Sequence, residues 1–188
     1  YEKALDNMRN KIGVFSMSFI PDCELLWSHY GYRHTGYMLH FEINLQEYFS
    51  NPILENTGTP IKVIYKKSIK PWSLARYYSE PEKHVYALLR FKSDAWKYES
   101  EIRLFNGKKF GFIKTPDTWL KSIVVCLAAE QELIEQLTSI GHELNIPVYF
   151  AEMAPSAYKV NIPGFGISGE VGQENYKRFL ASNVLEIK

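Results

Sequence analysis

The sequence predicts an α+β fold with a mixed, mostly antiparallel sheet and a C-terminal strand–helix–strand unit. Several segments alternate apolar and polar residues, as GYMLHFEI does at residues 36–43, and this pattern is typical of strands. Most of these segments are separated by short turns, which suit antiparallel pairing. Residues 122–153 instead combine a strand, an amphipathic helix and a second strand, an order that normally gives a parallel pair.

In the first half of the chain, alternating patterns and turn residues indicate the expected elements. Residues 1–12 suit a short helix and residues 13–19 a strand. A short helix should follow, with Asp22 as its N-cap and Gly31 at its end. The remaining expectations are strands at 36–43 and 60–69, a loop at 48–60, a loop or irregular helix at 70–84, and a helix at 85–91.

The second half is expected to be richer in strands. Residues 128–141 carry Leu133, Ile134, Leu137 and Ile140 on one helical face, so a helix is predicted that ends at Gly141. No internal repeat or low-complexity tract is present. The strands predicted in this half are residues 98–105, 110–113, 122–128, 146–153 and 158–162.

Size and composition indicate a single domain over residues 1–188 and exclude several classes of protein. Hydrophobic residues make up 46% of the chain and aromatic residues 15%, so a full core can form. The net charge of +1 argues against a dedicated nucleic-acid-binding or membrane-surface protein. The sequence contains no run of about 18 apolar residues, so no membrane-spanning helix is expected. The chain has 2 cysteines, too few for a disulfide framework, which favours the reducing cytoplasm.

The segment YESEIRLF aligns two acids and a base. If it forms a strand, Glu99, Glu101 and Arg103 share one face, with the acids about 7 Å apart along the chain. Neighbouring carboxylates repel each other, so one of them can have a raised pKa and take part in acid–base or cation-stabilising chemistry. The alternative is a solvent-exposed strand in which a Glu101–Arg103 pair contributes little to stability.

A second cluster, LLWSHYGYRHTG, gathers aromatic and basic side chains. Trp27 and Tyr30 offer flat surfaces for stacking, and His29 offers a donor, an acceptor or a general base. The alternative is an amphipathic turn whose aromatic residues belong to the core and whose histidines bind backbone groups. A zinc site would need a third ligand, and the spacing between His29 and His34 is not that of a helical zinc pair, so no metal is expected.

A third motif, GFGISG at residues 164–169, matches the glycine pattern of dinucleotide-binding loops. That fingerprint also needs a crossover, a second strand and an acid about 20 residues further on. Only 19 residues follow Gly169, too few for such a fold. A flexible glycine loop is therefore predicted, which could act as a mobile flap.

The order of the motifs resembles a known family. FSMS, then LLWSHYGYRHTGYMLHFE, then WKYESEIRL, and finally IVVCL and ELNIPVYFAEMAPSAYKVNI resemble the bacterial domain-of-unknown-function family 2971. The resemblance runs from about Phe15 to Ile162. Members of that family usually begin with a segment like LYKYRS…FNDPFD. This chain has no equivalent and starts without Met, so we expect an N-terminal segment to be missing.

A looser resemblance connects the chain with ADP-ribosyltransferase-like domains and implies their fold. Such domains place a His or Arg on an early strand, a Ser or Tyr motif on a second strand and a Glu on a later one. FSMS is similar to the second element through Ser16 and Ser18. ESE is similar to the third element through Glu99 and Glu101.

This second resemblance implies NAD as a substrate. Cleavage of the nicotinamide–ribose bond develops positive charge on the ribose, which Glu101 would stabilise while Ser16 orients the ribose or the acid. Glu99 would orient an acceptor or activate water, and His29 would act on the acceptor side. The residues implied to bind NAD are Trp27 and Tyr30, which would stack on nicotinamide, together with Ser18 and Arg103.

Three functions remain open from the sequence. The first is a bacterial NAD-consuming ADP-ribosyltransferase or NAD glycohydrolase, a toxin or phage-defence effector with a protein or nucleic-acid acceptor. The second is a non-catalytic binding or regulatory module. The third is an enzyme that processes nucleic acid through His29, Glu99 and Glu101. The basic and aromatic residues from Lys66 to Tyr78 could bind nucleic acid, but a solvated face is the commoner reason for such a pattern.

Overall fold

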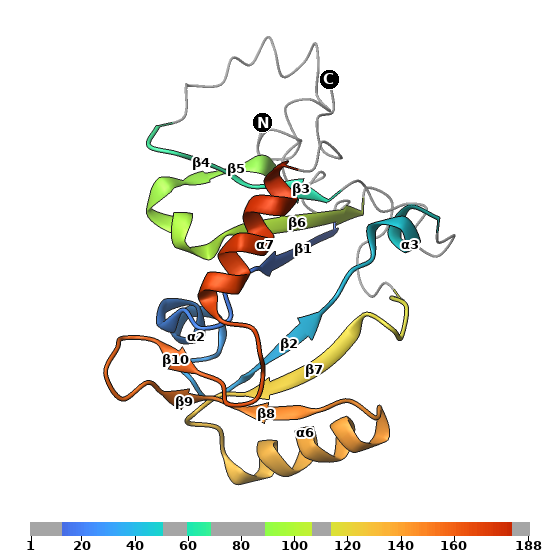
Figure 1. The fold of residues 1–188 in the computed structure, drawn as a ribbon, viewed down its shortest axis with the longest axis vertical. Helices are drawn as coiled ribbons and strands as arrows, with labels where there is room; N and C mark the ends of the chain where they lie inside the picture. The colour runs from blue at the N-terminus through green and yellow to red at the C-terminus, as the bar shows by residue number, and fades with distance from the viewer. Residues whose placement is uncertain (1–12, 51–59, 69–88, 107–113, 182–188) are drawn as a thin grey trace, which may run out of the picture. The chain divides into compact units, whose positions relative to one another are not determined.

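The computed structural model describes residues 13–50, 60–68, 89–106 and 114–181 (Figure 1). The chain divides into two compact units. Unit 1 comprises Tyr1–Phe19, Thr57–Gly111 and Gln173–Lys188, and unit 2 comprises Ile20–Asn56 and Phe112–Gly172. The expected single domain stays a prediction. Among the helices in the described ranges, none has the length and apolar character needed to cross a membrane.

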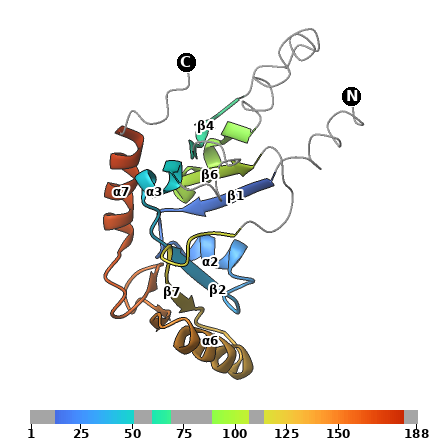
Figure 2. The ribbon, with the colours of Figure 1, turned by 90° about the vertical axis from the view of Figure 1, so that its right-hand side faces the viewer.

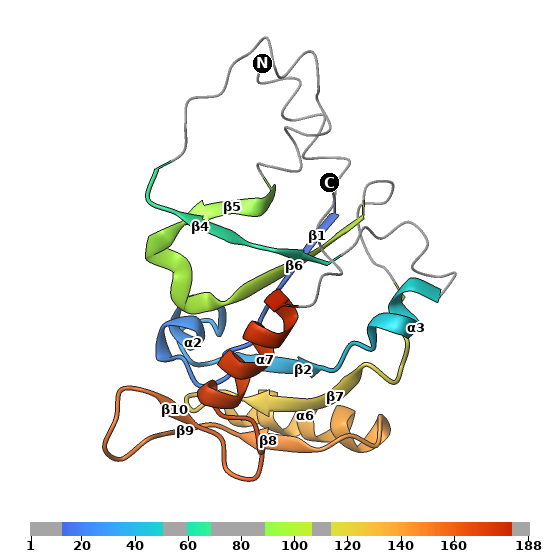
Figure 3. The same cartoon turned by 45° about the horizontal axis from the view of Figure 1, so that its top comes forward.

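Unit 1 is built around an antiparallel three-stranded sheet. Its central strand, β6 (Glu101–Asn106), pairs with β1 (Gly13–Ser18) on one side (Figure 2 and Figure 3) and with β3 (Ile61–Lys62) on the other (Figure 1). The other described elements of unit 1 are β4 (Ile64–Lys66), β5 (Phe91–Ser93), the 3₁₀ helix η2 (Asp94–Glu99) and most of α7 (Gly169–Ala181).

The pairing of β1 with β6 brings the two serines of FSMS beside the acid–base segment. Ser16 lies opposite Arg103, and Ser18 lies opposite Glu101. Directly opposite residues on paired strands project to the same face of a sheet, so these side chains can interact across the pair. The strand predicted at residues 13–19 is therefore confirmed.

Unit 2 contains a mixed three-stranded sheet with helices beside it (Figure 1). Its central strand, β7 (Leu120–Val125), pairs antiparallel with β2 (Tyr37–Phe41) and parallel with β8 (Val148–Phe150). The helix α6 (Gln131–Glu143) connects β7 to β8, so the predicted strand–helix–strand unit and the α+β class are confirmed. The other described elements of unit 2 are α2 (Glu24–Tyr30), α3 (Leu45–Ser50), β9 (Glu152–Met153) and β10 (Val160–Asn161).

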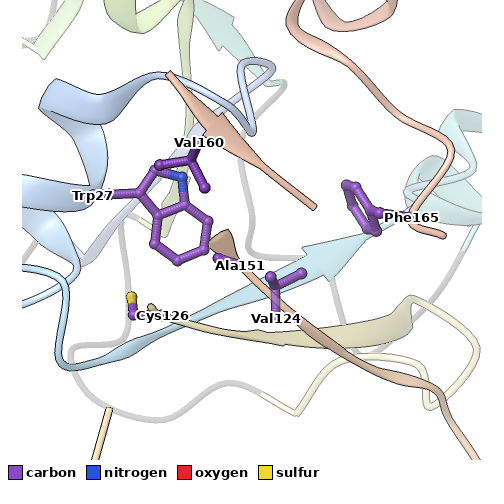
Figure 4. Close-up of a cluster of buried hydrophobic side chains, with 6 residues drawn as sticks. All are labelled: Trp27, Val124, Cys126, Ala151, Val160 and Phe165. Carbon is purple, nitrogen blue, oxygen red and sulfur yellow. The ribbon is translucent and has the colours of Figure 1, made fainter. Parts of the chain in front are cut away.

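Successive residues of β7 belong to two different hydrophobic clusters, because side chains alternate between the faces of a strand. Ile123 and Val125 pack with Leu137 of α6. Val124 instead belongs to a second cluster (Figure 4), whose other buried members are Trp27, Cys126, Ala151, Val160 and Phe165. Ile123, Val124 and Val125 are at most 1% exposed. Burial of each such side chain contributes about 1.5–3 kcal/mol, so β7 is the hydrophobic centre of unit 2.

Two short elements differ from the prediction. A loop was expected at residues 48–60, but α3 extends to Ser50, and residues 51–59 lie outside the described residues. Asn44 Oδ1 accepts hydrogen bonds from the backbone N–H groups of Gln46 and Glu47 at the start of α3. Phe91, expected in a helix, begins β5, which pairs in parallel with β4. Three predicted segments lie outside the described residues: the helix at 1–12, the irregular segment at 70–84 and the strand at 110–113.

Asp22 does not cap the helix for which it was predicted. α2 begins after Cys23, and no side chain caps it, although it ends at Gly31 as expected. Asp22 Oδ2 instead accepts a hydrogen bond of 2.9 Å from the backbone N–H of Gly169, the first residue of α7. A Cβ added at Gly169 would lie 2.1 Å from Asp22 Oδ1. A side chain at residue 169 would therefore have to displace the Asp22 carboxylate from the start of α7.

Gly141 lies within α6 rather than at its end. The helix continues to Glu143. A Cβ added at Gly141 would lie 2.3 Å from Val148 Cγ2 and 3.1 Å from the backbone oxygen of Ile146. The glycine thus allows α6 to pack closely on β8, and packing rather than helix termination explains its presence.

Gly141→Ala is expected to destabilise the protein by about 1–3 kcal/mol, because overpacking against Val148 outweighs a gain of about 1 kcal/mol in helix propensity. Urea unfolding followed by circular dichroism would measure the change. Ser139→Ala on the exposed side of α6 is the matched control, with an expected change within about 0.5 kcal/mol. Combining Gly141→Ala with Val148→Ala should cost less than the sum of the single changes, and an unaltered Gly141→Ala protein would contradict this account.

Candidate functional site

The two acids of the ESE segment share one cation. Lys92 Nζ donates one hydrogen bond to Glu99 Oε2 and another, of 2.9 Å, to Glu101 Oε2. Both carboxylates are buried, since Glu99 is 2% exposed and Glu101 is 5% exposed. The alternative of a solvent-exposed strand is therefore wrong for these two side chains.

Glu101 accepts hydrogen bonds from three side chains. Arg103 donates to both of its oxygens, from Nε to Oε1 at 2.7 Å and from Nη2 to Oε2 at 3.1 Å. Ser16 and Lys92 also bond the carboxylate, which therefore receives about as many hydrogen bonds as it can accept. Arg103 Nη1 donates to the backbone oxygen of Leu89 at 2.6 Å, which holds the guanidinium in place. We call Ser16, Lys92, Glu99, Glu101 and Arg103 the acid cluster.

A left-handed residue allows both acids to reach the same lysine. Glu99 is the last residue of η2 and Glu101 is the first residue of β6, so the predicted strand through both is wrong. Between them, Ser100 has φ 45° and ψ 52°, a conformation that costs a non-glycine residue about 1–2 kcal/mol. Its Oγ accepts a hydrogen bond of 3.1 Å from Gln173 Nε2 in α7. A sharp turn, not alternation along a strand, brings the acids together.

Hydrogen bonds fix the backbone on both sides of this turn. Ser18 Oγ donates to the backbone oxygen of Glu99 at 2.6 Å. The backbone N–H of Glu101 donates to Tyr65 Oη at 2.8 Å. The positions of the two acids are therefore set by β1 and β4 as well as by their own side-chain partners.

The donors around Glu101 determine its protonation state. Burial alone would raise the pKa of Glu101, but hydrogen bonds from Arg103, Lys92 and Ser16 outweigh burial and lower the pKa to about 2. Burial would lower the pKa of Lys92, yet its hydrogen bonds to Glu99 and Glu101 raise that pKa above its usual range. The expectation that repulsion would raise a pKa is thus wrong for Glu101, because two cations adjoin it. At neutral pH this carboxylate is an anion.

Five of the residues to which the sequence pointed lie in unit 1: Ser16, Ser18, Glu99, Glu101 and Arg103. Their interactions connect the FSMS and ESE motifs across the paired strands β1 and β6. Arg103, expected to bind a cofactor, bonds Glu101 and a backbone oxygen and therefore positions the acid.

Trp27, His29 and Tyr30 belong to unit 2 instead. Trp27 is 5% exposed, packs in the cluster shown in Figure 4, and donates from Nε1 to the backbone oxygen of Pro21 at 2.7 Å. Trp27 is therefore a core residue, which was the alternative to a stacking role. Its buried indole leaves no exposed ring face on which nicotinamide could stack. His29 and Tyr30 are exposed, with ring centroids 6.4 Å apart in an edge-to-face arrangement. Their roles at a site stay predictions.

Three residues of the site were not predicted from the sequence: Lys92, Tyr65 and Gln173. Lys92 follows a segment for which a helix was favoured, and Gln173 lies 73 residues from the serine that it bonds. One signal for a further cation did exist, because two acids buried together need more positive charge than Arg103 supplies. Sequence alone could not show that Lys92 provides it.

The other motifs add no residue to the acid cluster. Within the described ranges, no group of three or more His, Cys, Asp or Glu residues is arranged to hold a metal ion. In the basic and aromatic stretch from Lys66 to Tyr78, everything after residue 68 lies outside the described residues. Residues 164–168 of the GFGISG motif form a loop, as predicted, with Gly164 and Gly166 at φ 75° and 77°, whereas Gly169 begins α7.

Comparison with known proteins gives one family match, over part of the chain, and no activity. Residues 26–104 match the family described as Protein of unknown function (DUF2971). The predicted resemblance to family 2971 is therefore confirmed for this region, which is less than half of the chain. Neither the curated proteins nor the solved structures gave a match.

The stability of the protein should fall as pH decreases from about 5 to about 2. The pKa of Glu101 is about 2 in the folded state and 4.5 for the ordinary carboxyl, so its stabilising effect exists above pH 4.5 and is lost as pH falls through the folded value. Unfolding free energies measured by urea titration across this range should therefore decline less steeply for Glu101→Gln. Glu174→Gln, an exposed control, should keep the slope of the unmodified protein, and identical slopes for both variants would contradict the assignment.

Lys92→Met should destabilise the protein by about 3–5 kcal/mol, because it leaves two buried carboxylates without their shared cation. Arg178→Met is the control, since it removes an exposed ion pair with Glu174 whose contribution is within about 0.5 kcal/mol. Urea unfolding at pH 7 would compare them. If Lys92→Met and Arg178→Met had the same free energy of unfolding, the acid cluster would not be what holds unit 1 together.

Proposed function

We propose that the chain is a cytoplasmic NAD-consuming enzyme of the ADP-ribosyltransferase type, with Glu101 as its central catalytic residue. The observation that carries this proposal is the antiparallel pairing of β1 with β6, which sets Ser18 opposite Glu101 and Ser16 opposite Arg103. It joins the two motifs, FSMS and ESE, on which the resemblance to ADP-ribosyltransferase-like domains rests. The family description names no activity and adds no support.

The charge of Glu101 suits the chemistry of nicotinamide release. In that step the bond between the ribose C1′ and the nicotinamide nitrogen breaks, its electron pair leaves with nicotinamide, and positive charge develops on the ribose. A fixed anion stabilises such a state without reorganising during the reaction. The lowered pKa keeps Glu101 ionised, and Arg103 and Ser16 hold it in place. Glu101 would therefore stabilise charge rather than transfer a proton.

Binding of NAD would require one donor to leave Glu101, since its acceptor positions are filled. Lys92 is the donor best able to leave, because its ammonium keeps Glu99 as a partner. A ribose hydroxyl would then donate to Glu101 in its place. Attack by water would give ADP-ribose, nicotinamide and a proton, with Glu99 orienting the water. A protein or nucleic-acid acceptor would instead become ADP-ribosylated.

One feature favours a second candidate, a non-catalytic binding or regulatory module. The acid cluster contains two buried acids and two half-buried cations that bond to them, and it connects β1, β5, η2 and β6. Such a network can exist for structural reasons without any ligand. The nucleic-acid-processing hypothesis needs His29 beside the acids and stays a prediction, because these residues belong to different units.

Incubation of the protein with NAD is expected to release nicotinamide, as measured by chromatography, and to leave ADP-ribose free or attached to an added protein or nucleic acid. Glu101→Gln should lower this rate at least about 100-fold, because the fixed anion is lost. Ser16→Ala should lower it less, since Arg103 still holds the carboxylate.

The control for this experiment is Glu174→Gln, an exposed change in α7 that should leave the rate unaltered. Thermal unfolding of each variant would establish that the comparison is made between folded proteins. If the unmodified protein releases no nicotinamide and labels no macromolecule, while Glu101→Gln only lowers the melting temperature, the enzyme proposal fails and the binding or regulatory module is supported.

A further inference from the structure

Unit 2 has a cavity of about 300 Å³ that shares no residue with the acid cluster. It is lined by residues of β2, β7 and β8, and by the GFGISG loop. Its volume lies at the lower end of the range of about 300–1,000 Å³ that is usual for small-molecule sites. The lining combines aromatic rings, a histidine and two opposite charges, and each of these features restricts the chemistry of a ligand.

Three rings line the cavity in contact with one another. Phe165 meets Tyr149 at a centroid distance of 5.4 Å and His40 at 5.1 Å, both in edge-on arrangements. Aromatic side chains arranged in this way favour a ligand with a planar ring. Gly166, which also lines the cavity, has φ 77°. Apart from Gly166 and its two neighbours in the chain, no described residue has a heavy atom within 4 Å of the position that its Cβ would occupy. A glycine at this position leaves space that a side chain would fill.

His40 supplies a polar group to the cavity. Its Nδ1 lies 3.2 Å from Oγ of Ser122, which is 2% exposed. Burial lowers the pKa of His40, while Glu42 and Lys121 act on it in opposite directions, so the ring is neutral at neutral pH. The described residues provide no hydrogen-bond partner for Nε2, which can therefore bond a ligand.

Glu42 and Lys121 bring opposite charges to the same cavity. Both residues are exposed, and the structure gives neither side chain an ion pair or a hydrogen bond with any described residue. An unpaired acid and an unpaired base beside one cavity complement a ligand that carries both charges itself.

We propose that this cavity binds a small zwitterion with a planar ring, of which an aromatic α-amino acid is the simplest example. Glu42 accepts hydrogen bonds from the ammonium group, and Lys121 donates to the carboxylate. The ring packs against Phe165 and Tyr149. This binding site does not depend on NAD chemistry, and its test contains no NAD.

Isothermal titration of the full chain with L-phenylalanine, L-tyrosine, L-tryptophan and L-histidine tests the proposal. At least one of them is expected to bind with a stoichiometry of one. The N-acetyl and the amide derivatives of that amino acid each lack one charge and should bind at least about fivefold more weakly, as should L-leucine, which lacks the ring. Absence of binding by all four amino acids, or equal binding by L-leucine or by either derivative, would overturn the proposal.

Two exposed substitutions separate the roles of the charges. Glu42→Gln should weaken binding of the amino acid about fivefold and leave binding of its N-acetyl derivative unchanged. Lys121→Gln should likewise weaken binding of the amino acid about fivefold and should leave binding of its amide unchanged. Glu132→Gln and Lys114→Gln alter exposed residues of the same unit outside the cavity and serve as matched controls. Binding that neither cavity variant weakens, or that the controls weaken equally, would overturn the proposal.

Discussion

The burial of two carboxylates beside one ammonium group is the interaction on which unit 1 depends. An unpaired buried charge is too costly to persist, so each member of the acid cluster requires the others. Lys92 comes from β5, Glu99 from η2 and Glu101 from β6. The chain must therefore turn sharply after η2 and return beside β5. The same requirement explains why Arg103, two residues beyond Glu101, points back to it.

Features that depend on local pattern were predictable from the sequence, whereas features that depend on remote contacts were not. Alternation predicted β1 and β2, and apolar periodicity with a following strand predicted β7, α6 and β8. Gly141 and Asp22 were each assigned the usual local role of their residue type. Their actual roles involve Val148 and Gly169, which lie elsewhere in the chain and become neighbours only after folding.

At the candidate site, too, some features were predictable from the sequence and others depended on contacts formed only in the folded chain. Resemblance to known domains grouped Ser16 and Ser18 with Glu99 and Glu101, and the structure brings all four together. The strand geometry behind that expectation was wrong, because a 3₁₀ helix and a left-handed residue replace the first part of the strand. Trp27 illustrates the limit of composition, since a core indole and a stacking indole have the same sequence pattern. Only burial distinguishes them.

The left-handed conformation of Ser100 gives the backbone direct control over the distance between the acids. Side-chain torsions can change between several staggered rotamers, each of which would place a carboxylate differently. Here one pair of main-chain torsions, anchored by Gln173, separates Glu99 from Glu101. Protein engineering at residue 100 could thus tune the electrostatic coupling between the two acids while both keep their native chemistry.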